Sequence, residues 1–358
     1  MSLKERIAFE KSDAAPSTAV LQRLLEANRE SVLVVDAEHR VVAANRAAHF
    51  ALARPGDPII LSLVSEVIRD LQLDEAFNRA LDDRISSEIK IDLIESGRRR
   101  YDVFISPIEL DGRLHAIGVF YDVTRVERLE RVRQEFLSNI SHELRTPLTS
   151  ILAFVETLEN GGIDDAENNL RFLGIIRRNA ERMHSLIADI LELSMIEAGN
   201  VSIQTKPVRL RSLVEEVCTA LSSKAAERSV KLVNSVPAGV PASADPVRLE
   251  QMLTNLVDNA IKFNRPGGSV TISAVSAPEK TSISVSDTGE GIMPDHLPRV
   301  FERFYRADRG RTREIGGTGL GLAIVKHLAR LHGGEVSVAS EPGKGTAFTI
   351  ELPVKQSK

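Results

Sequence analysis

The chain has 358 residues, 42% of them hydrophobic and 27% charged, and a formal net charge of −4. Because one domain usually has roughly 100–200 residues, two or three domains are expected. The weak negative charge argues against a nucleic-acid partner. The one cysteine, Cys218, excludes an internal disulfide and fits a reducing compartment.

No apolar run reaches the roughly 18–20 residues needed to span a bilayer. The start, Met1 to Lys11, is charged and lacks the apolar core of a signal peptide. We therefore expect a cytoplasmic protein. Contact with a membrane is expected only if the chain is the cytosolic part of a longer, membrane-anchored sensor.

Residues 1–30 are a polar lead followed by a short amphipathic pattern. Residues 31–124 then change to strand-like periods, with a charged turn between the first two strands and short helical segments up to about Leu81. Turns are predicted at Gly97 and at Asp111-Gly112. This pattern predicts an α+β domain with an antiparallel sheet, whose strands are expected at 32–36, 41–45, 88–94, 101–108 and 115–123.

The order of elements in this domain, with polar residues at the ends of the first two strands, resembles the PAS sensor fold. Asp36 ends the first strand, Asn45 ends the second, and Asp122-Val-Thr124 resembles the exit motif by which PAS domains couple to an output helix. The region has no cysteine and its histidines are scattered, so neither a haem ligand nor a covalent flavin adduct is expected. These histidines are His39, His49 and His115.

Residues 125–200 have a purely helical pattern interrupted by a short loop. Helices are predicted up to about Glu159 and from about Asp165 to Ala198, with Asp164 as the N-cap of the second. One hairpin cannot bury two apolar stripes, so we expect a homodimer that forms a four-helix bundle. The stripe of the first helix consists of Val132, Phe136, Ile140, Leu144, Leu148, Ile151, Val155 and Leu158.

The run from Phe136 to Leu148 places His142, Glu143 and Thr146 within one helical turn, off the apolar stripe. Residues four apart share a helix face, so His142 and Thr146 point the same way. Pro147 is expected to bend the helix just past His142. A lone helical histidine is most often an ordinary surface residue. A catalytic role for His142 therefore needs support from other motifs in the chain.

Residues 201–358 alternate between strand and helix patterns, which predicts a two-layer α/β sandwich. Asp245 is expected to cap a strongly amphipathic helix. The helices are predicted at 208–221, 245–262 and 320–331, and the strands at 230–234, 269–275, 281–287, 335–340 and 346–352.

Two polar groups in this domain have a spacing that suggests ligand binding. Asn255, Asn259 and Lys262 recur on one helix face; amide oxygens suit Mg²⁺, although a solvated polar face would look the same. Asp287-Thr-Gly289-Glu-Gly291 follows a strand, where glycines allow a flat ligand to approach closely. A buried carboxylate there would select adenine through its exocyclic amino group, although an ordinary turn has the same sequence.

A glycine-rich run at residues 316–322 leads into a helix, where backbone N–H groups form an anion site. It is not a Walker loop, because no Gly-Lys-Ser/Thr follows. The residues between Gly291 and Gly316 are rich in Arg and Asp and suit a mobile lid over phosphates. The aromatic and basic segment from Phe301 to Arg306, within this stretch, could clasp such a lid. The run contains Gly317, Thr318, Gly319, Leu320 and Gly321.

These groups, in this order, closely resemble the ATP-binding domain of sensor histidine kinases, the Bergerat fold shared with gyrase and Hsp90-type ATPases. The run around His142 resembles the phosphoacceptor box of the same kinases. The resemblance covers about residues 125–355, and together with the PAS-like unit it is most similar to the phosphate-regulon group. It implies a multi-domain kinase with boundaries at 31–124, 125–200 and 201–358.

The resemblance also implies roles for individual residues. Mg²⁺ and ATP would bind in the last domain, with Asn259 on the metal and Asn255 supporting it. Asp287 would bind adenine, and Lys262 and Arg306 would meet phosphates. Backbone N–H groups of the glycine-rich run would hold the phosphate chain; the nucleotide-binding set is completed by Gly289, Gly291, Gly317, Thr318, Gly319, Leu320 and Gly321.

In this scheme His142 attacks the γ-phosphorus of ATP, and Glu143 hydrogen-bonds the ring and accepts its proton. The phosphoryl group then passes to an aspartate of a response-regulator receiver domain. Glu143 and Thr146 would serve regulator dephosphorylation, with the hydroxyl orienting water. Two alternatives stay open from the sequence: a Bergerat-type ATPase or chaperone, and a non-catalytic signalling scaffold.

Overall fold

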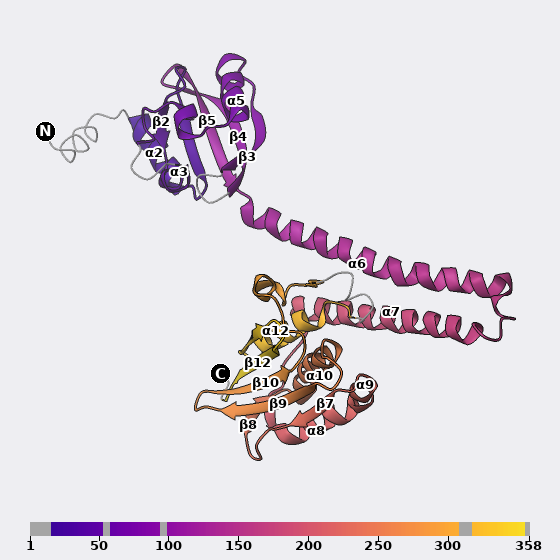
Figure 1. Ribbon diagram of the computed structural model, residues 1–358. Helices are drawn as coiled ribbons and strands as arrows, with labels where there is room; N and C mark the ends of the chain where they lie inside the picture. The colour runs from indigo at the N-terminus through magenta and orange to yellow at the C-terminus, as the bar shows by residue number, and fades with distance from the viewer. Residues whose placement is uncertain (1–15, 53–57, 94–98, 308–316, 355–358) are drawn as a thin grey trace. The chain divides into compact units, whose positions relative to one another are not determined.

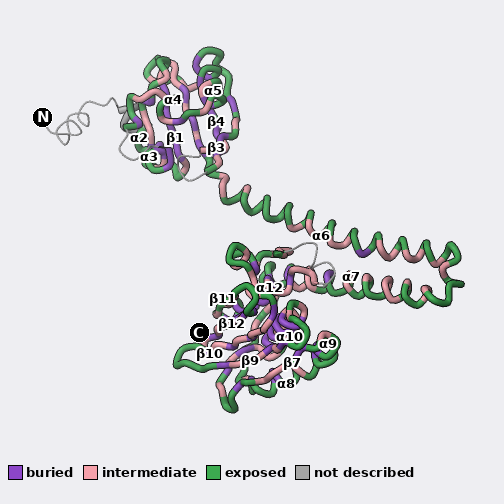
Figure 2. The backbone as a smooth tube through the Cα atoms, viewed as in Figure 1, coloured by how far each residue is buried: buried purple, intermediate pink, exposed green. Residues whose placement is uncertain are grey.

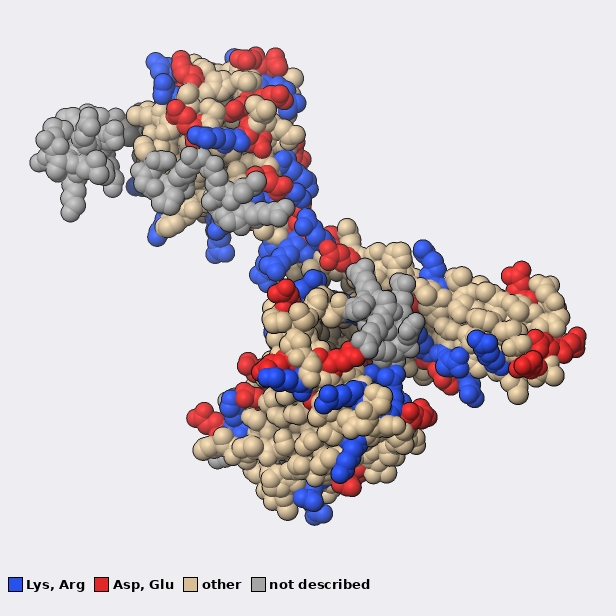
Figure 3. All heavy atoms as spheres, in the orientation of Figure 1, with Lys and Arg blue, Asp and Glu red and all other residues tan. Residues whose placement is uncertain are grey.

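A computed structural model describes residues 16–52, 58–93, 99–307 and 317–354 (Figure 1). The chain forms two compact units, residues 1–134 and 135–358. Within the described residues, no helix is long and apolar enough to cross a membrane. On the face drawn in Figure 3, acidic and basic side chains occur together on both units, in keeping with the small net charge.

The first unit contains the predicted antiparallel sheet, with strand order β2-β1-β5-β4-β3. The first two strands form the expected hairpin. The predicted turn at Gly97 lies outside the described residues. The strands are β1 (Ser31–Val35), β2 (Val41–Ala44), β3 (Ser87–Leu93), β4 (Arg99–Leu110) and β5 (Arg113–Asp122), and the helices are α2 (Pro16–Ala27), α3 (Arg46–Leu52), α4 (Val64–Val67) and α5 (Leu71–Asp82).

The core of this unit is filled by aromatic rings between α5 and the sheet. Phe77, Tyr101 and Phe120 are fully buried. Gly118 lies directly under Phe77, because a Cβ there would come within 2.9 Å of the ring. Asn45 is also buried, and its side chain accepts from the N–H of Val32 and donates to nearby carbonyls, so this polar residue closes the end of β2.

The predicted exit motif does end the last strand and begin a helix, α6 (Thr124–Thr157). The Thr124 hydroxyl accepts from the N–H of Arg100 at 2.9 Å. The Arg100 guanidinium reaches Asp92 on β3 and Glu127 on α6, each at 2.6 Å. The first turn of α6 is therefore tied to two strands of the sheet.

The helical hairpin consists of α6, a turn at η1 (Leu158–Gly162), and α7 (Asn169–Glu197). The second helix begins later than predicted, and Asp164 does not cap it. The carboxylate of Asp165 accepts from the N–H groups of Glu167 and Asn168 at 3.1 and 3.2 Å. This local turn competes with the helix, so α7 starts only at Asn169.

The apolar stripe of α6 is only partly covered within one chain. Val132 and Leu148 keep 44% and 45% of their surface exposed, and the nearby Leu152 keeps 60%. In Figure 2 most of α6 is exposed or intermediate. By contrast, Leu193 and Ile196 on α7 are buried in the core of the last domain. An apolar helix face that is left uncovered is what half of a helical bundle presents.

The last domain is a five-stranded sheet of order β11-β12-β10-β9-β7, in which only the β7–β9 pair is parallel. The strands are β7 (Lys231–Asn234), β9 (Ser269–Ser276), β10 (Lys280–Asp287), β11 (Glu335–Glu341) and β12 (Gly345–Pro353). The helices are α8 (Leu210–Ala220), α9 (Ser222–Glu227), α10 (Pro246–Lys262), η2 (Pro294–Arg299) and α12 (Gly321–Leu331).

The α-helices of this domain pack on one face of the sheet, which confirms the two-layer sandwich (Figure 1). Along β10, Ile283 and Val285 face this core, while Ser284 on the other face bonds the hydroxyl of Thr349 at 2.8 Å. Two short strands were not predicted: β6 (Lys206–Arg209) and β8 (Pro241–Ala244) pair with each other. The helix predicted from 208 consequently starts at Leu210.

Candidate functional site

His142 lies on an exposed face of α6, and Thr146 lies one turn further on. The Thr146 hydroxyl donates to the backbone carbonyl of His142 at 3.2 Å. Because the hydroxyl is bonded to its own helix, its orientation is fixed while its oxygen keeps the capacity to accept. The two side chains therefore share a solvent-facing patch, as their spacing predicts.

Glu143 is bound by two arginines. Its Oε2 accepts from Arg182 on α7 at 3.1 Å and from Arg306 of the last domain at 3.0 Å. The Arg306 side chain is only 6% exposed, and it also donates to the carbonyl of Gly317. The sequence predicted Glu143 beside the His142 ring and Arg306 beside phosphates. The structure instead joins these two residues to each other.

The polar face of α10 carries the predicted amides. Asn255 and Asn259 are half-buried, and within the described residues neither side chain has a hydrogen-bond partner. Gly321, at the start of α12, lies against Asn255, because a Cβ there would be 3.6 Å from the amide carbon. The start of α12 is thus adjacent to the amide of Asn255.

Lys262 lies on the same helix but is paired with a carboxylate. Its ammonium lies 2.5 Å from Asp258, which also binds Lys224 at 3.1 Å. Burial raises the pKa of Asp258, but the two lysines outweigh it, so the net pKa is lowered and the carboxylate stays charged. In this arrangement Lys262 is bound to its own helix.

Asp287, at the end of β10, has one oxygen held and one available. Its Oδ1 accepts from the N–H groups of Gly289 at 2.8 Å and Thr346 at 3.2 Å. Burial raises the pKa of Asp287, and these two hydrogen bonds only partly oppose the rise. Among the described residues, no group donates to Oδ2. A ligand amino group could donate there.

The glycines around Asp287 are required by close backbone contacts. A Cβ on Gly289 would lie 2.4 Å from the carbonyl oxygen of Phe263, and one on Gly291 would lie 2.1 Å from that of Glu341. Sequence reasoning missed Gly345, whose φ of +108° brings it against the carbonyl of Asp287, and its neighbour Thr346. The Gly-Lys-Gly-Thr run before the last strand was the available signal.

The glycine-rich run is described from Gly317 onward, so Gly316 lies outside the described residues. Gly319 has φ +73°, and its carbonyl accepts from the N–H of Phe304 at 2.9 Å. Leu320 is buried and anchors the start of α12. The Thr318 hydroxyl donates to Asp189 on α7 at 2.6 Å. Burial raises the pKa of Asp189, and the bond from Thr318 opposes this.

The segment from Phe301 to Arg306 also contacts the hairpin. The ring of Phe304 lies 5.7 Å from that of Phe136 on α6, centroid to centroid. The Arg303 guanidinium stacks 5.2 Å from the Phe136 ring and pairs with Glu197 on α7. The predicted nucleotide residues and the helix that carries His142 are thus joined within the second unit.

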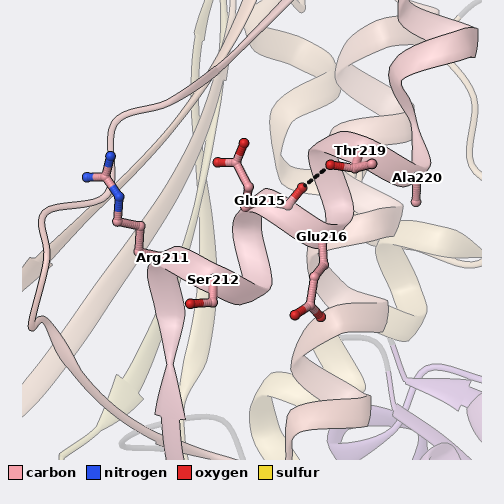
Figure 4. Close-up of a pocket in the computed structure, with 6 residues that line it drawn as sticks. All are labelled: Arg211, Ser212, Glu215, Glu216, Thr219 and Ala220. Carbon is pink, nitrogen blue, oxygen red and sulfur yellow. Dashed lines mark hydrogen bonds between the residues drawn. The ribbon is translucent and has the colours of Figure 1, made fainter.

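A separate hollow runs along α8, away from every predicted site residue (Figure 4). The Thr219 hydroxyl there donates to the carbonyl of Glu215 at 2.8 Å, and the Glu215 carboxylate accepts from Asn234 at 3.0 Å. These bonds are internal to the fold, so the hollow suggests no chemistry. It is lined by Arg211, Ser212, Glu215, Glu216, Thr219 and Ala220.

Three family models match the chain. They describe a PAS fold at residues 25–128, a His Kinase A (phospho-acceptor) domain at 132–199, and a histidine kinase-, DNA gyrase B- and HSP90-like ATPase at 244–356. The matched segments follow each other in the order that the sequence predicted.

Known proteins show the same likeness. The phosphate regulon sensor protein PhoR of Pseudomonas aeruginosa is 35% identical over 94% of this chain and 76% of its own length. The sensor histidine kinase WalK of Bacillus subtilis is 36% identical over 68% of this chain, which spans only 40% of WalK. The histidine kinase ThkA, solved in complex with the response regulator TrrA, has the same fold, with 20% identity, a TM-score of 0.52, and coverage of 93% of this chain and 98% of ThkA.

Proposed function

The chain belongs to the sensor histidine kinases, and from this premise we propose that its last domain transfers the γ-phosphoryl group of ATP to His142. Protein-histidine kinase activity and the use of ATP follow from the family. One observation supports this choice of residues most strongly. Arg306 binds both the carboxylate next to His142 and the carbonyl of Gly317 in the glycine-rich run.

Adenine binding is assigned to Asp287. Its Oδ1 is fixed by two backbone N–H groups, which leaves Oδ2 to accept from the exocyclic amino group of adenine. Guanine presents a carbonyl at the same position and would be repelled. A Cβ on Gly289 would lie 2.8 Å from Oδ1 of Asp287, so glycine at this position keeps a side chain away from the carboxylate.

Mg²⁺ is assigned to Asn259, with Asn255 supporting it. Both amides are half-buried without a hydrogen-bond partner among the described residues, and their oxygens are hard donors that suit this ion. In the described part of the chain no group of three His, Cys, Asp or Glu side chains could hold a metal. This fits an ion that is bound chiefly through phosphates, whose charge it would neutralise.

The phosphate chain is assigned to the backbone N–H groups at Gly317, Gly319 and Gly321, with Thr318 and Leu320 shaping the run. The N-terminus of α12 supplies a favourable field for anions. Lys262 and Arg306 add charge once they leave Asp258 and Glu143, to which they are bound here. Binding of the phosphates to Arg306 would thereby break its ion pair with Glu143 on the hairpin.

In the transfer step, a ring nitrogen of His142 forms a bond to the γ-phosphorus while the bond to the ADP oxygen breaks. Glu143 accepts the proton that leaves the ring. Positioning and charge neutralisation supply most of the catalysis. Because Glu143 is bound to Arg182 and Arg306, the transfer requires that Arg306 move from the carboxylate to the phosphates.

The partners follow from the same family. The half-exposed apolar stripe of α6 supports a homodimer through residues 125–200. ThkA was solved with a response regulator, which supports phosphoryl transfer from His142 to a receiver-domain aspartate here. Thr146, fixed beside His142, would orient the water that dephosphorylates the regulator. We place the protein in the cytoplasm, as part of a membrane-anchored sensor if the chain is a fragment.

Incubation with γ-labelled ATP tests this proposal. The wild-type chain should acquire acid-labile label, and His142→Ala should lose all of it while still binding ATP. His184→Ala, on α7, is the matched control and should label like wild type. Equal labelling of wild type and His142→Ala would contradict the proposal, and hydrolysis without any protein label would favour an ATPase.

A further inference from the structure

His332 is a fully buried histidine at the C-terminal end of α12, with 1% of its surface exposed. Its Nδ1 lies 2.7 Å from the carbonyl oxygen of Leu328, and its Nε2 lies 3.1 Å from the backbone nitrogen of Asp245. A carbonyl can only accept and a backbone N–H can only donate. The ring is therefore neutral, with its proton on Nδ1 and a lone pair on Nε2.

Asp245, the partner of this ring, is the N-cap of α10. Its Oδ1 accepts from the N–H groups of Val247 and Arg248 at 3.1 and 3.3 Å, and its Oδ2 accepts from Gln204 at 3.1 Å. One imidazole consequently joins the last turn of α12 to the first turn of α10. Because the ring is buried, loss of either bond leaves a polar group unsatisfied.

The same two helices meet again where the start of α12 lies against the middle of α10. Gly321, the first residue of α12, lies against the amide of Asn255 on α10. From Asp245 to Asn255 is ten residues, and from Gly321 to His332 is eleven, so the two antiparallel helices span nearly equal lengths, about 15–17 Å. The apolar side chains between these two contacts can slide more easily than a directional hydrogen bond can stretch.

We propose that His332 is a positioning residue that fixes the axial register of α10 against α12. The register in turn holds Asn255 and Asn259 opposite the glycine-rich run. A shift of α10 along its axis would displace both amides while leaving the fold intact. This inference rests on the proposed ATP site, and its test measures ATP binding separately from phosphoryl transfer.

Two substitutions of His332 each keep a different one of the ring's two hydrogen bonds. A glutamine amide reaches about as far as Nε2, so His332→Gln can still accept from Asp245 through its oxygen. An asparagine amide reaches only as far as Nδ1, so His332→Asn keeps the bond to Leu328 and loses the one to Asp245. We expect His332→Asn to raise the ATP dissociation constant and KM about tenfold, as loss of one buried hydrogen bond would. His332→Gln should restore most of the affinity.

The full chain is used, with a fluorescent ATP analogue for binding and thermal melting for stability. Ile283→Val, a buried change in β10, is the stability control. It should lower the melting temperature without changing ATP affinity. Equal ATP affinity of the Asn and Gln variants would overturn the proposal. So would a loss of ATP affinity in Ile283→Val as large as that in His332→Asn at a similar melting temperature, because lower stability alone would then explain the effect. Failure of the wild type itself to bind ATP would refute the proposed function instead.

If neither His332 variant folds, the wild-type ring is measured by nitrogen NMR. The proposal requires a proton on Nδ1 and a hydrogen bond from the Asp245 amide to Nε2 that persists when the ATP analogue binds. A proton on Nε2, or loss of this bond on binding, would overturn it.

Discussion

At the scale of the residue, Asp287 is oriented by contacts from two parts of the chain. It ends β10 just before two glycines, and its Oδ1 accepts from the N–H of Gly289. Its partner Thr346 lies 59 residues further along the chain. The sequence around Asp287 contains no signal for a hydrogen bond from a backbone N–H on a distant strand. The carboxylate could therefore be predicted, but not what orients it.

Asp287→Asn should weaken ATP binding about tenfold or more, roughly 1–3 kcal/mol. The amide oxygen can replace Oδ1 towards Gly289 and Thr346, but its NH₂ group then opposes the amino group of adenine. Discrimination between ATP and GTP should fall as well. Competition binding with both nucleotides measures this. Asp258→Asn, an equal charge change that acts on Lys224 and Lys262 instead of the adenine contact, is the control and should leave the preference for ATP over GTP unchanged. Unchanged ATP affinity in Asp287→Asn would remove Asp287 from the site.

The raised pKa of Asp287 predicts how the affinity for ATP changes with pH. The carboxylate must be charged to accept from adenine, and burial makes it take up a proton at a higher pH than an ordinary aspartate. When the pH is lowered, ATP affinity should therefore begin to fall at a higher pH than the one at which exposed aspartates become protonated. Asp287→Asn should lack this step.

Thr146 separates the two reactions proposed for the helix. Thr146→Ala removes the hydroxyl next to His142, so dephosphorylation of a phosphorylated regulator should fall at least tenfold while autophosphorylation survives. Thr157→Ala is a matched control, because Thr157 also donates to the carbonyl four residues earlier, on the same helix. If autophosphorylation disappears as well, Thr146 has another role or the helix has been disturbed.

At the scale of elements, helices and strands whose ends depend on neighbouring residues were predicted correctly, and those that depend on distant or competing contacts were not. α10 begins where expected because Asp245 and Pro246 determine its first turn by themselves. The start of α7 was wrong because the side chain of Asp165 forms a competing turn. The pair β6–β8 was missed because both strands have four residues and depend on a long-range partner, Lys206 opposite Ala244.

The contact between α7 and the glycine-rich run predicts a competition with nucleotide. The Thr318 hydroxyl donates a hydrogen bond to Asp189. If ATP binding rearranges the glycine-rich run, this hydrogen bond must break. Asp189→Ala should therefore tighten ATP binding about threefold, in line with a net hydrogen bond of about 0.5–1.5 kcal/mol. Asp189→Asn keeps an acceptor for Thr318 and should bind ATP like wild type. Equal affinity of both variants would show that the contact does not compete.

At the scale of the whole molecule, the order of the domains could be predicted because each has its own local motifs. The PAS-type strands, the run around His142 and the glycine-rich run each identify one domain without reference to the others. The contact of Glu143 with Arg306 could not be predicted, because it joins residues 163 positions apart. The sequence assigned both residues to the reaction but not to each other.

That contact joins two residues proposed for the reaction in one ion pair. Arg306 is nearly buried between the carboxylate of Glu143 and the carbonyl of Gly317. Because breaking a largely buried ion pair leaves a charge uncompensated, Arg306 needs another anion when it leaves Glu143. We propose that ATP phosphates replace Glu143 as the anion bound to Arg306.

The most direct test of the account is to identify the residue that receives the phosphoryl group. The full chain would be incubated with Mg²⁺ and ATP, digested at neutral or alkaline pH to preserve phosphohistidine, and mapped by mass spectrometry. We predict one phosphoryl group on His142, absent when Asn259 is replaced by alanine. A phosphoryl group on Ser141 or on any other residue instead, or phosphorylation of His142 that persists in Asn259→Ala, would contradict it.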